Sequence, residues 1–318
     1  MKSYLVTCVS LLMATISVLA DGCGKTSRVG FHSGLTMHSG DRTRTYAINI
    51  PSTYNDHPYK KWPLIIDFHG NGGTPEQQYN NSMYYAYAAG QKYIVVYPAG
   101  VSKHWQGPSY AVPGVDDLQF TTDLLEVIRN NYCIDSNHIY ASGKSNGGGF
   151  VDTLACSDNG DEFAAFAMAA AALYTDTSRA GCNKSRPILE AHGLADRTIP
   201  YKGTSDGNGG PLPSILAWLD WWAERDGCPQ GNAQKTTVAK TGYNIIWYTC
   251  NGISQVVKHY QVPGLGHCWP SSHGNNYDSR KSSCSDRSLD FTPVVLDFFN
   301  SWDLVKTSSL GANSDLCS

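Results

Sequence analysis

A serine between two glycines is the residue in this sequence most clearly placed to do chemistry. Residues 143–147 read G-K-S-N-G, so Ser145 stands at the centre of a G-x-S-x-G pattern. The apolar residues 139–141 before it are typical of a short buried strand, and residues 150–156 after it suit a helix. A serine at such a sharp strand-to-helix turn exposes its hydroxyl and can act as a nucleophile. A Gly-rich surface turn would have the same composition, so the assignment depends on finding partners for the serine.

A serine nucleophile needs a histidine as general base and a carboxylate that orients this histidine. In α/β-hydrolases the acid and then the histidine follow the serine along the chain, each in a loop after a strand. Asp196 follows the predicted strand at residues 186–192. His267 lies between glycines in a loop after the predicted strand at 256–262. We therefore expect Ser145, Asp196 and His267 to form a catalytic triad.

Other acids and histidines are weaker candidates for the same two roles. Asp206 and Asp226 do not closely follow a strand, and a loop aspartate commonly caps a turn or helix. His192 and His259 lie within predicted strands, and His273 lies in a loop rich in Ser, Gly and Asn. Asp196 and His267 remain the favoured pair.

A second glycine-rich stretch is placed to stabilise an oxyanion. Residues 69–73 read H-G-N-G-G and directly follow the apolar run at 63–68. An H-G-G-G motif in this position supplies a backbone amide to the oxyanion hole, together with the amide after the nucleophile. We expect the amides of Gly70, Asn71 and Asn146 to do so here. We find no metal-ligand spacing in the sequence and expect neither a metal nor another cofactor.

The elements that must position these residues alternate between strands and helices. Strands are expected at 44–51, 63–68, 93–98, 139–141, 164–173, 186–192, 244–250 and 256–262, and helices at 83–90, 116–132, 150–156, 213–225 and 289–302. The first strand is expected at the sheet edge, and Asn251-Gly252 predicts a hairpin between the last two. Such alternation favours an α/β fold with a mostly parallel central sheet and helices on both faces. We expect residues 21–318 to form one catalytic domain.

The first 20 residues indicate export. Lys2, the apolar stretch 5–19 and the small residues 18–20 have the pattern of a secretory signal peptide. The net charge of −3 and the absence of a basic patch disfavour nucleic acid and membrane partners. Asn80 and Asn183 begin glycosylation sequons. We therefore expect a secreted, extracellular monomer.

The cysteine content also fits an oxidising compartment. Nine cysteines follow the predicted signal peptide, at positions 23, 133, 156, 182, 228, 250, 268, 284 and 317. Disulfides are expected in a secreted chain, and an odd number leaves at least one thiol without a partner inside the chain. Cys228–Cys250 and Cys268–Cys284 are plausible local pairs, but sequence alone does not determine the connectivity.

Together these motifs resemble the secreted fungal feruloyl esterases, which are akin to polyhydroxybutyrate-depolymerase-type esterases and to acetylxylan esterases. The resemblance covers about residues 23–302. It rests on residues 69–73 and 114–120, N-H-I-Y-A-S-G-K-S-N-G-G at 137–148, H-G-L-A-D-R-T-I-P-Y at 192–201 and G-L-G-H-C-W-P at 264–270. It implies an α/β-hydrolase fold, the triad named above, and release of ferulic or related hydroxycinnamic acids from arabinoxylan. Lys144 precedes the serine, so the Cys–Cys bridge of tannase-like feruloyl esterases cannot form.

The acyl group is the least determined feature. Trp105, Tyr201 and Trp269 flank loops expected at the substrate cleft, where an aromatic wall would suit a phenolic acid or a sugar face. They could equally pack the loops. An acetylxylan esterase or a polyester depolymerase would use the same triad. A carbohydrate-binding pseudo-esterase is disfavoured because both the serine and the histidine are present.

Overall fold

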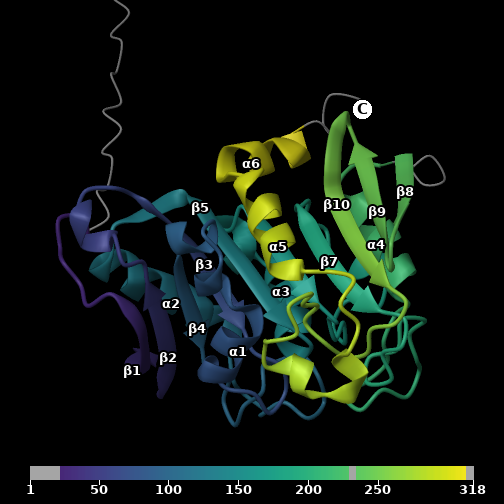
Figure 1. Ribbon diagram of the computed structural model, residues 1–318, viewed down its shortest axis with the longest axis horizontal. Coiled ribbons are helices and arrows are strands. Elements are labelled where there is room, and N and C mark those ends of the chain that lie inside the picture. Colours follow the sequence, from purple (N-terminus) through teal and green to yellow (C-terminus); the bar gives the residue numbers. More distant parts are fainter. Residues whose placement is uncertain (1–21, 229–233, 313–318) are drawn as a thin grey trace, which may run out of the picture.

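The computed structural model describes residues 22–228 and 234–312, and a single sheet runs through them (Figure 1). Its strands are β1 Gly30–Ser39, β2 Arg42–Ile50, β3 Trp62–Phe68, β4 Ile94–Pro98, β5 Ile134–Lys144, β6 Ala165–Ala169, β7 Ile188–Gly193, β8 Gln234–Lys240, β9 Tyr243–Cys250 and β10 Ile253–Val262. The helices are α1 Pro75–Ser82, α2 Asp117–Asn131, α3 Asn146–Ala155, α4 Ile215–Arg225, α5 Phe291–Asn300 and α6 Leu304–Ala312. The predicted signal peptide and Cys317 lie outside the described residues.

The centre of the sheet is parallel and its two margins are antiparallel. The strand order is β1-β2-β4-β3-β5-β6-β7-β10-β9-β8. The strands from β4 to β10 in this order pair in parallel, whereas β1, β2, β8 and β9 pair antiparallel. This confirms the expected mostly parallel sheet. In a parallel sheet the strands end at the same edge, so the loops after β5, β7 and β10 meet there.

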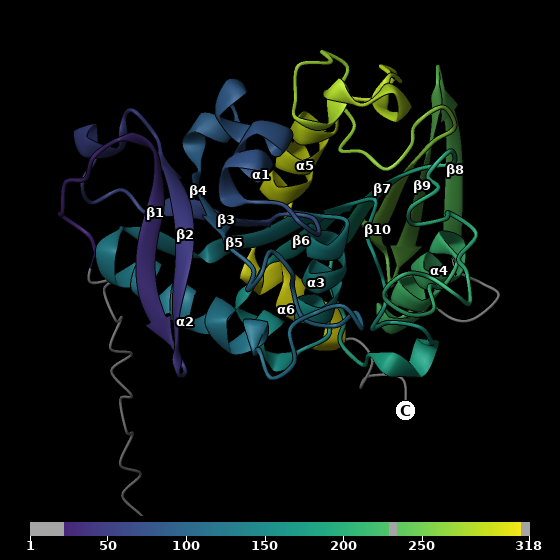
Figure 2. The ribbon, with the colours of Figure 1, turned by 90° about the horizontal axis from the view of Figure 1, so that it is seen from below.

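Helices cover both faces, as the sequence predicts, and divide the core into two main layers. In Figure 2, α1 and α5 lie on one side of the sheet and α2 and α3 on the other. Phe120 of α2, Phe150 of α3 and Trp218 of α4 belong to one buried apolar cluster, and Phe291 of α5 and Leu310 of α6 to the other. The central strands are buried on both faces, which explains their continuous apolar runs.

Several predicted elements differ from the structure. The strand predicted at 44–51 is not at the edge, because β1 pairs with it on the outside. β1 was missed since most of it is half-buried or exposed and its apolar alternation is weak. The helix predicted at 83–90 is wrong: α1 ends before it, Met83 adopts a left-handed conformation with φ 49°, and short 3-10 turns follow.

α1 was missed because its buried face is polar. Its buried residues are Gln78, Asn81 and Ser82, so no apolar period marks it. A cap signal was nevertheless present: the Thr74 hydroxyl accepts from the amide of Gln77 and Pro75 opens the helix. β8 and α6 were not predicted from the sequence either.

Four disulfides brace the fold. The two local pairs named from sequence, Cys228–Cys250 and Cys268–Cys284, are both present. Cys23–Cys133 and Cys156–Cys182 are the other two disulfides among the residues that the structure describes. Four disulfides fit an oxidising compartment. In the described part of the chain, no helix has both the length and the apolar character needed to cross a bilayer.

Candidate active site

Ser145 stands between β5 and α3 in a strained backbone conformation. β5 ends at Lys144, α3 begins at Asn146, and the serine has φ 58° and ψ −122°. The flanking glycines are required by close packing: a Cβ on Gly147 would lie 2.2 Å from the Phe68 carbonyl oxygen, and one on Gly143 would lie 2.6 Å from the Gly147 oxygen. Strain of this kind persists only where the surroundings enforce it, and it gathers at functional sites.

The three candidate triad residues form one hydrogen-bonded line. The Ser145 hydroxyl lies 2.7 Å from Nε2 of His267, and Nδ1 of His267 lies 2.7 Å from Oδ2 of Asp196. The amides of Thr198 and Ile199 donate to the other oxygen of Asp196 at 2.8 and 2.9 Å. Nδ1 therefore donates to the carboxylate and Nε2 accepts from the hydroxyl. A serine in this arrangement can pass its proton to the histidine as it attacks a carbonyl carbon.

The electrostatic surroundings favour an ionised acid and a neutral base. Burial would raise the pKa of Asp196, but the close contact with His192 and the hydrogen bond from His267 outweigh it and hold that pKa well below its ordinary value. Burial, followed by the positive charge of Lys144, lowers the pKa of His267. His267 therefore stays neutral to a lower pH than a free imidazole does, and the neutral form is the one that accepts a proton.

The loop at residues 69–73 packs against the serine. A Cβ on Gly70 would lie 3.3 Å from the Cβ of Ser145, a tight contact that glycine avoids. The amides of Gly72 and Gly73 donate to the carbonyls of Lys103 and Gly70, at 3.0 and 2.9 Å. The amides of Gly70 and Asn71 remain the candidates for an oxyanion in this loop. Asn146 is the first residue of α3, whose first amides have no partner within the helix.

Two buried side chains fix this oxyanion loop and the start of α3. His69 accepts from the amide of Gly100 at 3.1 Å through Nε2, so its Nδ1 donates to the Gly70 carbonyl at 2.8 Å. Burial lowers the pKa of His69 to about 4, so it is neutral near pH 7. The Asn146 side chain accepts from the amide of Trp105 at 2.8 Å. The histidine of the H-G-N-G-G motif is thus placed to support the loop.

The three aromatics expected at a substrate cleft are instead buried in the protein. Trp105, Tyr201 and Trp269 are 0%, 8% and 1% exposed. Trp105 donates to the His69 carbonyl, Trp269 to the hydroxyl of Thr292, and Tyr201 shares its hydroxyl with His259 and Gln261. The expectation that they form a substrate-facing wall is therefore wrong. Their indole and phenol groups serve as internal hydrogen-bond partners, which burial of such side chains demands.

A polar hollow of about 190 Å³ opens beside the oxyanion loop. Its lining includes Asn71, Gln77, Lys144, Tyr277 and Lys281. Lys144 is buried and pairs with Asp278 at 3.0 Å, and half-exposed Lys281 contacts the same carboxylate at 2.9 Å. This group was not predicted from the sequence. The only local signal was a lysine directly before the nucleophile, because residues 277–281 lie far away in the chain.

The rival residues have other surroundings. Asp226 is buried and accepts from the amide of Arg186, and Asp206 is exposed and bonds the nearby Thr204. His273 is exposed beside Asp290. His192 and His259 are buried and contact Glu190, and His192 also approaches Asp196. None of these contacts Ser145.

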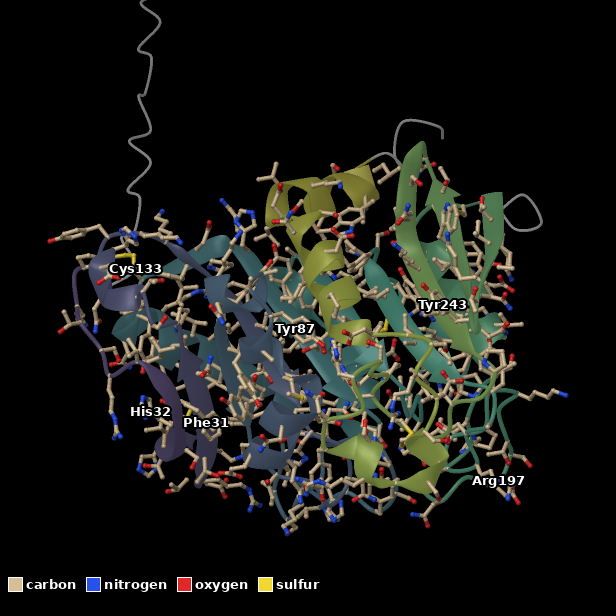
Figure 3. The ribbon with its side chains drawn as sticks, in the orientation of Figure 1. Phe31, His32, Tyr87, Cys133, Arg197 and Tyr243 are labelled. Carbon is tan, nitrogen blue, oxygen red and sulfur yellow. A yellow bond between two sulfur atoms is a disulfide. The ribbon has the colours of Figure 1, made fainter. Side chains whose placement is uncertain are left out.

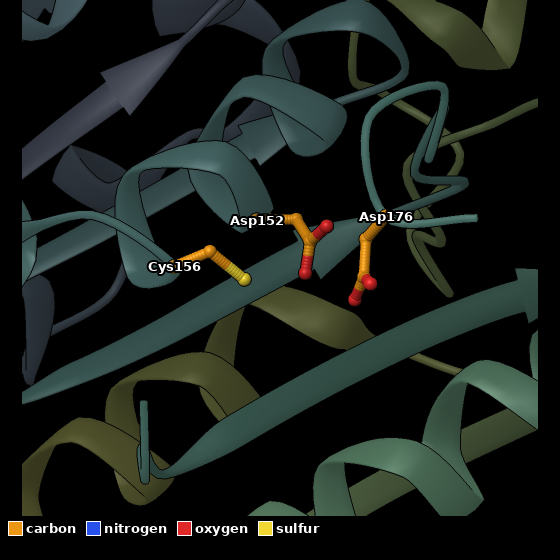
Figure 4. A group of neighbouring side chains, drawn as sticks. All are labelled: Asp152, Cys156 and Asp176. Atoms are coloured by element: carbon orange, nitrogen blue, oxygen red, sulfur yellow. The ribbon is translucent and has the colours of Figure 1, made fainter. Parts of the chain in front are cut away.

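The grouped acids and cysteine in Figure 4 do not offer a free metal site. Asp152, Cys156 and Asp176 bring ligand atoms within 4.8 Å of one another, the one such group among the described residues. Cys156 is bonded to Cys182, and both oxygens of Asp176 accept from Arg225. Asp152 accepts from the indoles of two tryptophans on α4. These contacts give the group a structural role in joining α3 to α4.

No protein-family model matches the sequence. Curated proteins similar to it include a bifunctional acetylxylan esterase/xylanase of Neocallimastix patriciarum (26% identical over 66% of this chain), feruloyl esterase D of Neurospora crassa (25% over 73%) and feruloyl esterase B of Piromyces equi (28% over 66%). The aligned regions span 29%, 86% and 42% of these proteins. These similarities bear out the resemblance to fungal esterases.

Solved structures confirm the fold class. An acetyl xylan esterase from Aspergillus awamori superposes with a TM-score of 0.54 at 14% identity, over 75% of this chain and 94% of that one. A thermostable esterase superposes with a TM-score of 0.54 at 14% identity, over 90% and 64%. The chain has an α/β-hydrolase fold.

Proposed function

We propose that this chain is a serine esterase that removes acyl groups from plant cell-wall polysaccharide, with Ser145, His267 and Asp196 as its catalytic triad. The observation that carries the proposal is the line of two 2.7 Å contacts from the strained serine to the buried aspartate. The similarity to fungal feruloyl and acetylxylan esterases supports the substrate class. Residues 21–318 would act as one secreted domain.

The reaction runs in two halves. The Ser145 oxygen attacks the ester carbonyl carbon while Nε2 of His267 takes the hydroxyl proton, which gives a tetrahedral oxyanion. The amide of Asn146 and one from Gly70 or Asn71 donate to this oxyanion; losing one such donor typically costs about 3–4 kcal/mol. His267 then gives its proton to the departing sugar oxygen, and the acyl group stays on Ser145. Water attacks the acyl-enzyme by the same steps and releases the carboxylic acid.

The acyl group is proposed to be ferulate or a related hydroxycinnamate. Acetate is a second candidate, favoured by one observation. The hollow beside the oxyanion loop is lined mainly by polar groups, among them amide side chains, two lysines and Asp278, and Tyr277 is the only tyrosine or tryptophan in its lining. The three aromatics expected at the cleft are buried elsewhere. A phenolic ring gains about 0.5–1.5 kcal/mol from stacking on an aromatic side chain beyond the burial of its area. A cleft with only one such side chain gains less from stacking, so it would favour a phenolic acyl group over acetate less strongly.

A hydrolysis panel tests both the activity and the acyl group. Purified protein is assayed with methyl ferulate, methyl caffeate, methyl sinapate, acetylated xylan and a hydroxybutyrate oligomer. The proposal expects hydrolysis of the first three with a higher kcat/KM than that of acetylated xylan. Faster acetyl release would assign the protein to acetyl ester hydrolysis and leave the triad in place. No hydrolysis of any ester would overturn the proposed function.

A further inference from the structure

A buried polar cluster lies beside Asp196 and takes no part in the acyl transfer described above. Glu190 and His192 belong to β7, and His259 belongs to the neighbouring strand β10, in register with Glu190. All three side chains are fully buried. Buried ionisable groups are costly unless they are paired, so this cluster needs an explanation.

The partners of His192 determine where its hydrogens lie. Nε2 is 2.9 Å from the Ile199 carbonyl oxygen, and a carbonyl oxygen only accepts, so Nε2 carries a hydrogen. Nδ1 is 2.9 Å from a carboxyl oxygen of Glu190. If Glu190 is ionised, it also only accepts, and both nitrogens of His192 then carry hydrogens.

The other contacts of Glu190 favour its ionised form. Gln261 donates to the Tyr201 hydroxyl at 2.9 Å, so this hydroxyl is free to donate to Nε2 of His259 at 3.1 Å. His259 then carries its hydrogen on Nδ1, which lies 2.8 Å from the second oxygen of Glu190, a close approach without hydrogen-bond alignment. Both carboxyl oxygens thus face N–H groups, the arrangement that suits a carboxylate.

His192 connects this carboxylate to Asp196 in two ways. Its Nε2 lies 3.3 Å from Oδ2 of Asp196, the oxygen that also accepts from His267. The Ile199 carbonyl that accepts from His192 belongs to the residue whose amide donates to Asp196. His192 therefore fixes the loop around Asp196 and also lies close enough to stabilise the negative charge of its carboxylate.

We propose that His192 is a buried imidazolium, held by Glu190, which positions Asp196 and extends the triad inward as Glu190–His192–Asp196–His267. This role rests on the proposed function of Asp196 and His267 in ester hydrolysis. His192 touches no reacting atom and acts through Asp196.

The charges around His192 and His267 fix the sign of the effect. Burial alone would lower the pKa of His192, but the negative charge of Glu190 and the contact with Asp196 outweigh it and raise that pKa. His267 faces Asp196, which favours its protonation, and Lys144 and His192, which oppose it. Removing the positive charge at residue 192 makes His267 more basic. The acid limb of the kcat/KM profile then moves to higher pH.

Three variants separate this electrostatic role from packing. His192→Gln keeps a donor amide near the position of Nε2 without the charge, and Glu190→Gln lets His192 become neutral. His192→Gln is expected to raise the acid limb, by up to about one pH unit for a neighbouring charge. Glu190→Gln is expected to raise it less, because that substitution also removes a negative charge. His259→Gln is the matched control, because it is equally buried and also contacts Glu190 but not Asp196. It is expected to lower stability and leave the limb where it is.

Nitrogen-15 NMR of the wild-type histidine rings gives a readout that needs no activity. The expected result is a His192 ring protonated on both nitrogens from pH 5 to 8. A ring protonated on Nε2 alone in this range overturns the proposal. An acid limb that stays unchanged in both His192→Gln and Glu190→Gln overturns it as well. If His192→Gln does not fold, Glu190→Gln and the spectrum decide. A wild-type protein that hydrolyses no ester refutes the proposed function, and the spectrum still tests the imidazolium.

Discussion

At the scale of single residues, the proposed chemistry depends on how little freedom each group has. Ser145 is held at positive φ, and the close packing around residues 143 and 147 admits only glycine at these two positions. Asp196 is held through one oxygen by two backbone amides and through the other by His267. Such fixed donors and acceptors need no rearrangement during the reaction, which is why preorganised groups contribute strongly to rate.

Replacing the acid should damage turnover more than binding. Asp196→Asn keeps the size of the side chain but can place an amide N–H towards His267, which favours the wrong tautomer of the imidazole. We expect kcat to fall by about 10⁴-fold with KM nearly unchanged. Steady-state kinetics on one ester substrate measures this. Asp206→Asn is the matched control, since Asp206 is exposed and bonds only its neighbour Thr204 among the described residues. Equal losses in the two variants would argue against the role of Asp196.

The charge of Lys144, directly before the nucleophile, should influence the pH at which kcat/KM falls on the acid side. After burial, the charge of Lys144 is the main cause that lowers the pKa of His267. Lys144→Gln removes this charge, so the pKa of His267 rises and the acid limb of kcat/KM moves to higher pH. Lys281→Gln is the control, because Lys281 shares Asp278 as its partner but is half-exposed. A limb unmoved by Lys144→Gln, or moved as far by Lys281→Gln, would contradict the electrostatic account.

At the scale of elements, the disulfide next to the candidate histidine braces a loop that has no regular strand or long helix of its own. Cys268 follows His267 directly and is bonded to Cys284, while the Gly266 amide donates to the Ser283 carbonyl at 2.8 Å. A disulfide and a backbone hydrogen bond therefore hold the loop of His267 against the segment around residue 283.

Removing this disulfide should lower kcat, whereas removing a similar disulfide elsewhere in the fold should not. Cys268→Ser with Cys284→Ser opens a loop of 16 residues. Cys228→Ser with Cys250→Ser opens one of 22, which joins the segment after α4 to the end of β9 and contains no triad residue. In the chain-entropy model each costs about 3 kcal/mol of stability. Thermal melts should show similar losses, whereas kcat measured well below the melting temperature should fall only in the first pair. The same fall in both would refute a local role of Cys268–Cys284.

At the scale of the whole molecule, the parallel sheet explains why distant residues meet. The triad candidates follow β5, β7 and β10, which lie close together in the sheet although β10 is far from β5 in sequence. Figure 3 places Arg197, next to Asp196, at the opposite end of the molecule from Cys133. The site is thus confined to the edge where the parallel strands end, as is usual for open α/β sheets.

The parts predictable from sequence were those with a local signature. Apolar strands, the Asn251-Gly252 hairpin and the glycine patterns all act within a few residues. Polar elements such as α1 and the edge strand β1 lack the apolar periodicity on which the prediction of helices and strands depends. The Lys144–Asp278 pair and the Glu190–His192–Asp196 contacts depend on which loops meet in space, which periodicity does not reveal. Trp105 and Trp269 were expected at the cleft because they lie in loops near the motifs. Whether a loop aromatic is buried depends on its tertiary neighbours, which the sequence does not show.

Covalent labelling of the intact protein tests the central claim most directly. A fluorophosphonate reacts with an activated serine hydroxyl, and intact-mass and peptide mass spectrometry locate the label. The account predicts one label per chain on Ser145, with loss of esterase activity in proportion to labelling, and neither label nor activity in a folded Ser145→Ala variant. His267→Ala should also abolish labelling, because the two residues act as one unit. Label on another residue, or undiminished hydrolysis by Ser145→Ala, would contradict the assignment of Ser145 as the nucleophile.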